Sequence, residues 1–128
     1  MPSIILIDDD ASLRDLMRLH LSRKGMAVTA CEDAATGIRE MLRARPDLLV
    51  LDLTLPDLGG LQVLQAVRGD AATKTLPVVL LTARRDIDTI SEARRLGANA
   101  FLIKPVRLDK LTTTIMDELA KPAAAKRN

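Results

Sequence analysis

Aromatic residues are almost absent from this chain of 128 residues: Phe101 is the only one, with no tryptophan or tyrosine. Proteins that bind single-stranded nucleic acid stack the bases on aromatic side chains, and that platform is missing here. A flavin held between aromatic rings is disfavoured for the same reason. The net charge is only +2, which is too weak to indicate binding to nucleic acid. We therefore expect no direct contact between this domain and nucleic acid.

Cysteine and long apolar runs are also scarce. Cys31 is the only cysteine, so an internal disulfide framework is excluded, and its position predicts a small buried side chain. No apolar run approaches the roughly 20 residues needed to cross a bilayer. Met1-Pro2-Ser3 leads directly into an apolar segment without a basic, cleavable leader. These absences favour a cytoplasmic protein without membrane contact.

What the chain does contain is a repeated alternation of short apolar runs and amphipathic segments, which predicts alternating strands and helices. We expect strands near residues 3–8, 26–31, 47–52, 77–82 and 99–104, and helices near residues 11–24, 34–44, 60–69, 86–96 and 108–120. Three of the runs are apolar throughout, which is typical of parallel strands covered on both faces. The run at 26–31 is more polar and is expected at an edge of the sheet.

Residues that favour helix ends agree with this division. Gly25 and Gly97 fall where the first and fourth helices should end. Asp33 and Asp86 fall where the second and fourth should begin, as N-caps or first-turn acids. Five strand–helix units with right-handed crossovers predict a doubly wound α/β domain of three layers.

The domain is expected to occupy residues 1–120. The last residues, 121–128, have no apolar periodicity. We interpret them as a tail or as the start of a linker.

Polar side chains follow four of the predicted strands where each strand ends. They are Asp8-Asp9-Asp10 after the first strand, Asp52 after the third, Thr82 after the fourth and Lys104-Pro105 after the fifth. The carboxyl ends of parallel strands meet at one edge of the sheet, where open α/β folds place their chemistry. Carboxylates, a hydroxyl and an ammonium gathered there suit a divalent metal together with a phosphoryl group.

Each type of residue has a chemical reason to be there. Mg²⁺ prefers oxygen ligands, which Asp8, Asp9 and Asp52 can supply, and a bound cation relieves the repulsion between crowded carboxylates. Capping of the first helix explains one of the three consecutive aspartates, Asp10, but not all of them. Asp52 can act as a nucleophile and form an aspartyl phosphate. The turn-forming residues at 56–60 can bend a backbone carbonyl towards the metal.

Thr82 and Lys104 are interpreted differently. The Thr82 hydroxyl can donate to a phosphoryl oxygen, but Thr82 also fits an ordinary β-branched strand residue. A lysine in an apolar stretch needs an anionic partner, and the carboxylates or a phosphate provide one. A cis bond between Lys104 and Pro105, which is uncommon in folded proteins, would turn the lysine into the site.

Five motifs in this order resemble those of one family. They are Ile-Asp-Asp at 7–9, Leu-Asp-Leu-Thr-Leu-Pro at 51–56, Gly60, Leu-Thr-Ala at 81–83 and Phe-Leu-Ile-Lys-Pro at 101–105. Over residues 3–120 the chain resembles the receiver domain of two-component response regulators. The resemblance implies a flavodoxin-like fold with strand order 2-1-3-4-5. It implies a signalling phosphoacceptor that assists its own phosphorylation and dephosphorylation, rather than an enzyme.

The resemblance also implies roles for particular residues. Asp52 would accept a phosphoryl group from a histidine kinase or a histidine phosphotransfer protein. Asp9 and Asp52 would bind Mg²⁺ directly, Asp8 through water, and Thr54 through its backbone carbonyl. The phosphoryl oxygens would be held by Thr82 and Lys104.

Phe101 occupies the aromatic switch position of the family, although a plain core role also fits it. On phosphorylation, Thr82 would move towards the phosphoryl group and Phe101 would rotate inward. The face formed by residues 86–120 would then change shape and control a partner or an output domain.

The same face carries several arginines, namely Arg84, Arg85, Arg94, Arg95 and Arg107. They fit either a solvated helix surface or a docking surface for an acidic partner. Arg94 and Arg95 depart from the pattern of winged-helix regulators in this family, which puts the dimer contacts of that subgroup in doubt. Whether the domain dimerises on phosphorylation stays open.

Three other functions compete with the phosphoacceptor. Asp8-x-Asp10-x-Ser12 after a strand also fits a haloacid-dehalogenase-type phosphohydrolase with Asp8 as nucleophile, but that assignment leaves Asp52 and Thr82 unexplained. A phosphorylation-independent interaction module of the same fold would usually lack one or more of the site residues. A flavodoxin-type electron carrier is disfavoured by the lack of aromatic residues and of a phosphate loop rich in Ser and Thr.

Overall fold

The computed structural model of the chain describes residues 1–83 and 87–121. Its strands are β1 (Ser3–Ile7), β2 (Ala27–Cys31), β3 (Leu48–Asp52), β4 (Val78–Thr82) and β5 (Ala100–Ile103). Its helices are α1 (Ala11–Arg23), α2 (Ala34–Ala44), α3 (Gly60–Gly69), α4 (Ile87–Arg95) and α5 (Leu108–Ala120). Each element matches a predicted segment to within about one residue, the usual uncertainty of a helix or strand end.

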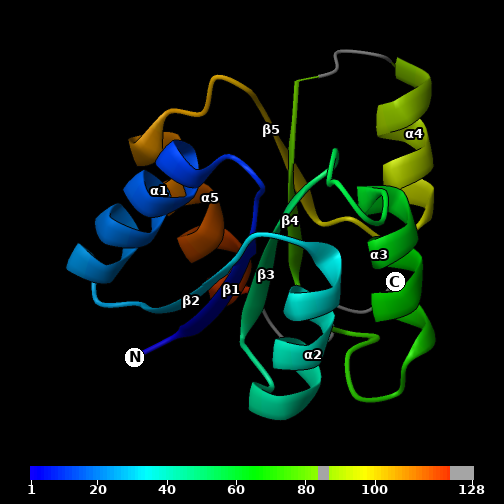
Figure 1. Cartoon of the computed structure of the whole chain (residues 1–128), viewed down its shortest axis with the longest axis horizontal. Coiled ribbons are helices and arrows are strands. Elements are labelled where there is room, and N and C mark those ends of the chain that lie inside the picture. The colour runs from blue at the N-terminus through cyan, green and yellow to red at the C-terminus, as the bar shows by residue number, and fades with distance from the viewer. Residues whose placement is uncertain (84–86, 122–128) are drawn as a thin grey trace.

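The strands form one parallel sheet in the order β2-β1-β3-β4-β5. The predicted order 2-1-3-4-5 and the doubly wound α/β class are therefore confirmed, and β2 lies at an edge as expected. Helices α1 and α5 cover one face of the sheet, and α2, α3 and α4 cover the other (Figure 1).

The core consists of two apolar layers, one on each face of the sheet. Strand side chains point alternately to opposite faces. Ile4 and Leu6 of β1 accordingly pack with α1 and α5, whereas Ile5 and Ile7 pack with α2, α3 and α4. Burial of each such side chain contributes about 2 kcal/mol. Because β1, β3 and β4 are covered on both faces, the groups at their carboxyl ends have a rigid base.

The helix ends follow the sequence closely. Asp10 caps α1 by accepting a hydrogen bond from the Leu13 amide at 3.1 Å, and Asp33 caps α2 by accepting one from Thr36 at 2.8 Å. Gly25 and Gly97 adopt φ angles of 86° and 98°, the left-handed conformation expected of the residue that follows a helix. The predicted cap at residue 86 lies outside the described residues.

Cys31 is buried, as predicted. Burial is the main cause that raises the pKa of its thiol, to about 11. The thiol therefore stays protonated, and unreactive as a nucleophile, at neutral pH.

No helix in the described part of the chain combines the length and apolar character needed to cross a membrane. Helix α5 ends at Ala120. Residues 122–128 lie outside the described part, so the expected tail or linker stays a prediction.

Candidate functional site

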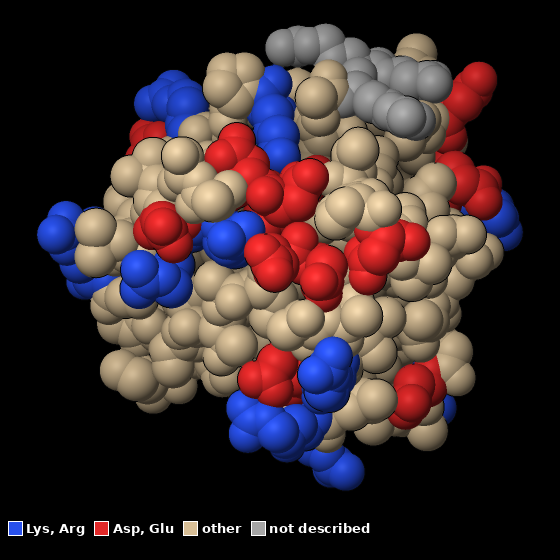
Figure 2. All heavy atoms as spheres, in the orientation of Figure 1, with Lys and Arg blue, Asp and Glu red and all other residues tan. Residues whose placement is uncertain are grey.

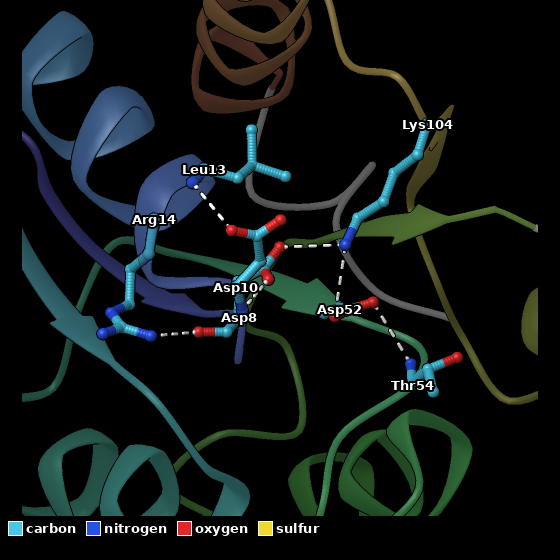
Figure 3. Close-up of polar contacts among 7 residues, drawn as sticks. All are labelled: Asp8, Asp10, Leu13, Arg14, Asp52, Thr54 and Lys104. Atoms are coloured by element: carbon cyan, nitrogen blue, oxygen red, sulfur yellow. Dashed lines mark hydrogen bonds and ion pairs between the residues drawn. The ribbon is translucent and has the colours of Figure 1, made fainter.

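The predicted site residues meet at the carboxyl edge of the sheet. Asp8 directly follows β1, Asp52 ends β3, and Lys104 follows β5. The Lys104 Nζ lies 3.2 Å from the Asp8 Oδ2 and 3.3 Å from the Asp52 Oδ2. Figure 3 shows both carboxylates directed at this ammonium from neighbouring strands. Residues almost a hundred positions apart in the sequence therefore form one ionic cluster.

Thr82 completes this edge at the end of β4. It is buried, and β4 lies between β3 and β5 in the sheet. The backbone amide of Lys104 donates to the Thr82 carbonyl at 2.8 Å, and the Leu53 amide donates to the Leu81 carbonyl at the same distance. These bonds extend the sheet by one residue and hold the ends of β3, β4 and β5 level. The Lys104–Pro105 peptide bond is cis.

Burial and charge act against each other in this cluster. The side chains of Asp8 and Asp52 are 0% and 5% exposed, and that of Lys104 is 22% exposed. Burial raises the pKa of Asp52, although the Thr54 amide and Lys104 oppose the shift. Burial alone would lower the pKa of Lys104, but Asp52 and Asp8 outweigh it and raise the pKa. The lysine is therefore cationic at neutral pH.

The same residues have the donor set of a divalent cation site. Asp8, Asp9 and Asp52 each place a carboxylate oxygen within 4.8 Å of the other two. The Asp8 Oδ2 is buried, and within the described part of the chain it accepts no hydrogen bond of good geometry, although the ammonium is nearby. Three carboxylates with one ammonium leave an excess of negative charge. A cation with a preference for oxygen ligands fits this cluster, and Figure 2 shows acidic side chains gathered on the face in view.

The loop between β3 and α3 lies beside this cluster. The Thr54 amide donates to the Asp52 Oδ1 at 3.2 Å, and the Gly60 amide donates to the Leu53 carbonyl at 2.8 Å. A Cβ on Gly60 would lie 2.5 Å from the Leu53 Cα, so only glycine fits where the loop closes. The loop thus starts from a fixed base next to the acidic cluster.

Two supporting residues escaped the sequence analysis. The Arg14 guanidinium, on α1, donates to the Asp8 carbonyl at 2.8 Å. Asp57, in the loop after β3, accepts hydrogen bonds from the amides of Ala34 and Ala35 at the start of α2. No sequence pattern links either residue to its partner, because both contacts depend on how separate elements pack.

Phe101 lies on β5, partly buried against the apolar layer formed with α3 and α4. The Arg94 guanidinium carbon is 4.8 Å from the centre of its ring, within the range of a cation–π contact. This contact orients Arg94 across the face that contains β5.

Three of the five arginines predicted on this face, Arg94, Arg95 and Arg107, lie within the described residues. Arg95 pairs with Glu92, and Arg107 pairs with Asp109 at 2.9 Å. These pairs reduce the positive charge that the two arginines present to a partner. Arg84 and Arg85 lie outside the described residues.

With this geometry established, comparisons with known proteins give the family. Residues 4–116 match the family described as the response regulator receiver domain. The chain therefore belongs to that family, as the motifs indicated. Domains of this family are the signalling phosphoacceptors of two-component systems, and they bind Mg²⁺ at an acidic pocket. This chain has a cluster of aspartates, Asp8, Asp9 and Asp52, at the carboxyl edge of its sheet.

Several characterised regulators are similar in sequence. The chain is 37% identical over 107 residues to the transcriptional regulatory protein AfsQ1 of Streptomyces coelicolor, a match that covers 84% of this chain and 46% of AfsQ1. It is 36% identical to the regulatory protein LuxO of Vibrio cholerae, covering 94% of this chain and 26% of LuxO. The chain thus spans about half or less of the length of these relatives.

Solved structures have the same fold. A two-component response regulator from Clostridium difficile has a TM-score of 0.89 and 25% sequence identity, with 94% of this chain and 98% of that chain covered. The chemotaxis response regulator CheY4 of Vibrio cholerae has a TM-score of 0.87 and 26% identity, with 91% and 98% covered. These structures, with the family match, support the phosphorylation-based receiver role over the competing functions.

Proposed function

We propose that Asp52 is the residue that accepts the phosphoryl group. The supporting observation is its place in the cluster. Asp52 is a buried carboxylate at the end of a central strand, with the Lys104 Nζ 3.3 Å from its Oδ2 and two further aspartates within 4.8 Å. Such a carboxylate is held rigidly, and it has a cation beside it to receive the negative charge that phosphorylation adds.

The metal ligands in this proposal are carboxylates of the same cluster with one loop carbonyl. Asp9 and Asp52 bind Mg²⁺ directly, Asp8 binds it through water, and Thr54 contributes its backbone carbonyl. Mg²⁺, when bound, offsets the repulsion between these carboxylates and the incoming phosphoryl oxygens. The Asp8 Oδ2 is buried and, in the described residues, has the Lys104 ammonium nearby but accepts no hydrogen bond of good geometry, which supports a further cation at this position.

In the transfer step a carboxylate oxygen of Asp52 attacks the phosphorus atom. An oxygen–phosphorus bond forms as the nitrogen–phosphorus bond of a phosphohistidine donor breaks, and the released imidazole takes a proton from solvent. Lys104 and Thr82 hold the transferred phosphoryl oxygens, Lys104 with its ammonium and Thr82 with its hydroxyl. Hydrolysis of the aspartyl phosphate at the same site releases inorganic phosphate and resets the domain.

The donor is a sensor histidine kinase or a histidine phosphotransfer protein. The output face consists of α4, β5 and α5, with Phe101 as the switch residue and Arg94, Arg95 and Arg107 in contact with an acidic partner. We include Arg84 in this contact surface on the basis of the sequence alone. Phosphorylation shifts the population between two states of this face because the phosphoryl group makes different contacts in each state.

The first experiment measures intact mass after incubation with acetyl phosphate, with and without Mg²⁺. The proteins are the wild type, Asp52→Asn and Asp8→Asn. We expect the wild type to gain the mass of one phosphoryl group only with Mg²⁺, and Asp52→Asn to gain none. Asp8→Asn keeps the acceptor but loses one of the carboxylates around the metal, so its adduct should form more slowly.

Two results would contradict the proposal. An adduct that persists in Asp52→Asn but is lost in Asp8→Asn would assign the nucleophile to Asp8, as a phosphohydrolase requires. A wild-type protein that gains no mass under any condition would point to an interaction module that works without phosphorylation.

A further inference from the structure

Asp57 joins the loop after β3 to the start of helix α2. Its Oδ1 accepts a hydrogen bond from the Ala34 amide at 3.0 Å, and its Oδ2 accepts one from the Ala35 amide at 3.1 Å. These amides belong to the first turn of α2 and have no partner within the helix. They are the main cause that lowers the pKa of Asp57. A residue of one loop thus caps a helix that begins more than twenty positions earlier.

The same helix has a second, local cap. Asp33 directly precedes α2, and its Oδ1 accepts from the Thr36 amide at 2.8 Å. The two aspartates therefore divide the first-turn amides between them. Asp33 makes its contact within its own segment, whereas the contact of Asp57 crosses between two loops.

This contact fixes the outer end of the loop that contains Thr54. At its base the loop is closed by the bond from the Gly60 amide to the Leu53 carbonyl, and the Thr54 amide is bonded to Asp52. At its exposed end, the contacts of Asp57 with α2 hold it. The Leu58 amide also donates to the Asp57 Oδ1, at 3.0 Å. A loop held at both ends has few conformations left, so Thr54, whose amide is bonded to Asp52, has little freedom to move.

We infer that Asp57 is a positioning residue for the cation site: by bonding to the first turn of α2, it holds the loop so that the Thr54 carbonyl faces the carboxylates. The inference rests on the proposed function, because Thr54 is a metal ligand only there. Asp57 does not contact the metal itself. It acts by keeping the loop in the conformation that binds metal, and this raises the fraction of molecules ready to bind.

The experiment compares Mg²⁺ affinity, measured by isothermal titration calorimetry on the whole chain, for the wild type, Asp57→Ala and Asp33→Ala. Both variants remove one carboxylate and part of the cap of α2, but only Asp57→Ala releases the loop. If the released loop adopts the metal-binding conformation in about one fifth of the molecules, the apparent Kd for Mg²⁺ rises about fivefold, because only that fraction can bind. Asp33→Ala should leave the Kd at the wild-type value.

A third variant separates the effect of the hydrogen bonds to α2 from the effect of the negative charge of Asp57. Asp57→Asn removes the same charge as Asp57→Ala but keeps a side-chain oxygen that can accept from an amide. Its Kd should lie between those of the wild type and Asp57→Ala. Initial rates of phosphorylation by acetyl phosphate should follow the Kd at low Mg²⁺ and return to the wild-type rate at saturating Mg²⁺, since the chemical groups are intact.

Hydrogen exchange tests the same coupling from the other side, because the effect of one site on another is reciprocal. In the wild type, Mg²⁺ should slow exchange of the Ala34 and Ala35 amides relative to that of Thr36. In Asp57→Ala this difference should disappear. Thr36 serves as the internal reference, since its partner is Asp33.

The inference is overturned if Asp57→Ala and Asp33→Ala bind Mg²⁺ equally well, or if Mg²⁺ slows exchange of all three amides to the same extent. A wild-type protein that binds no Mg²⁺ would instead overturn the proposed function. If Asp57→Ala does not fold, Asp57→Asn decides, since it removes only part of the contact.

Discussion

Lys104 contacts two buried carboxylates at once, and this arrangement determines what its substitution does. Its ammonium lies 3.2 Å from Asp8 and 3.3 Å from Asp52, whose side chains are 0% and 5% exposed. Without the ammonium, two carboxylates would remain in a low-dielectric environment with no counter-charge. The residue therefore stabilises the fold in addition to its proposed contact with phosphate.

We predict that Lys104→Met lowers the free energy of unfolding without Mg²⁺. Loss of one partner from a fully buried pair costs about 3–5 kcal/mol, and partial exposure of Lys104 reduces the expected cost to about 2 kcal/mol. Because Mg²⁺ would supply positive charge to the same carboxylates, it should stabilise this variant more than the wild type. Urea denaturation with and without Mg²⁺ measures both effects.

The matched control is Lys110→Met on the exposed surface of α5, which should leave the unfolding free energy nearly unchanged. Equal stabilities of the Lys104 and Lys110 variants without Mg²⁺ would show that the ion pairs with Asp8 and Asp52 add nothing to the fold.

At the scale of an element, helix α3 has a glycine at each end with opposite requirements. A Cβ on Gly60 would lie 2.5 Å from the Leu53 Cα and 2.8 Å from the Asp52 carbonyl oxygen. A Cβ on Gly69 would meet nothing within 4 Å. The first glycine allows the helix to start against the end of β3, whereas the second has no such role.

Alanine at these two positions should therefore have effects of opposite sign. Gly60→Ala should destabilise the protein by about 2 kcal/mol, because backbone atoms must move to admit the methyl group. Gly69→Ala should stabilise it by about 0.5 kcal/mol, since alanine favours the helix more than glycine does. Urea unfolding of both variants tests the pair, and a stabilised Gly60→Ala would contradict the close approach of α3 to β3.

Helix boundaries were predictable at this scale because their signals are local. Asp10 and Asp33 cap α1 and α2 through amides three positions ahead, and a glycine after the helix needs only its own backbone freedom. Asp57 also caps α2, but from a distant loop. Its sequence context indicates a turn and contains no information about which amides it will meet.

At the scale of the whole molecule, the face formed by α4, β5 and α5 combines exposed arginines with the aromatic residue Phe101. Arg94 lies over that ring, 4.8 Å from its centre, whereas Arg95 is already paired with Glu92. We predict that reversing both charges, with Arg94→Glu and Arg95→Glu together, weakens capture of an acidic partner. Phosphorylation of Asp52 should be unaffected, because neither residue belongs to the acidic cluster.

A pull-down with the phosphorylated domain measures capture, and intact mass measures phosphorylation. Arg39→Glu with Arg43→Glu on α2 is the matched control, since Arg43 pairs with Glu40 as Arg95 does with Glu92. If the wild type and both double variants capture the partner equally well, Arg94 and Arg95 are ordinary solvated surface residues and do not bind the partner.

By itself the sequence determined the order of the elements, the parallel sheet and the group of residues at its carboxyl edge. This was possible because apolar periodicity is local, and because parallel strands bring every strand end to one edge, so that Asp8, Asp52 and Lys104 had to meet.

Only the tertiary structure decided what supports that group. The Arg14 guanidinium reaches the Asp8 carbonyl, and Asp57 reaches α2. At the opposite edge of the sheet, Arg68 donates to the carbonyls of Leu76 and Gly97, which precede β4 and β5. Each of these contacts joins segments whose distance and orientation are set by packing of the whole chain. A pattern along the sequence cannot specify them, because a hydrogen bond depends on separations of a few tenths of an ångström in three dimensions.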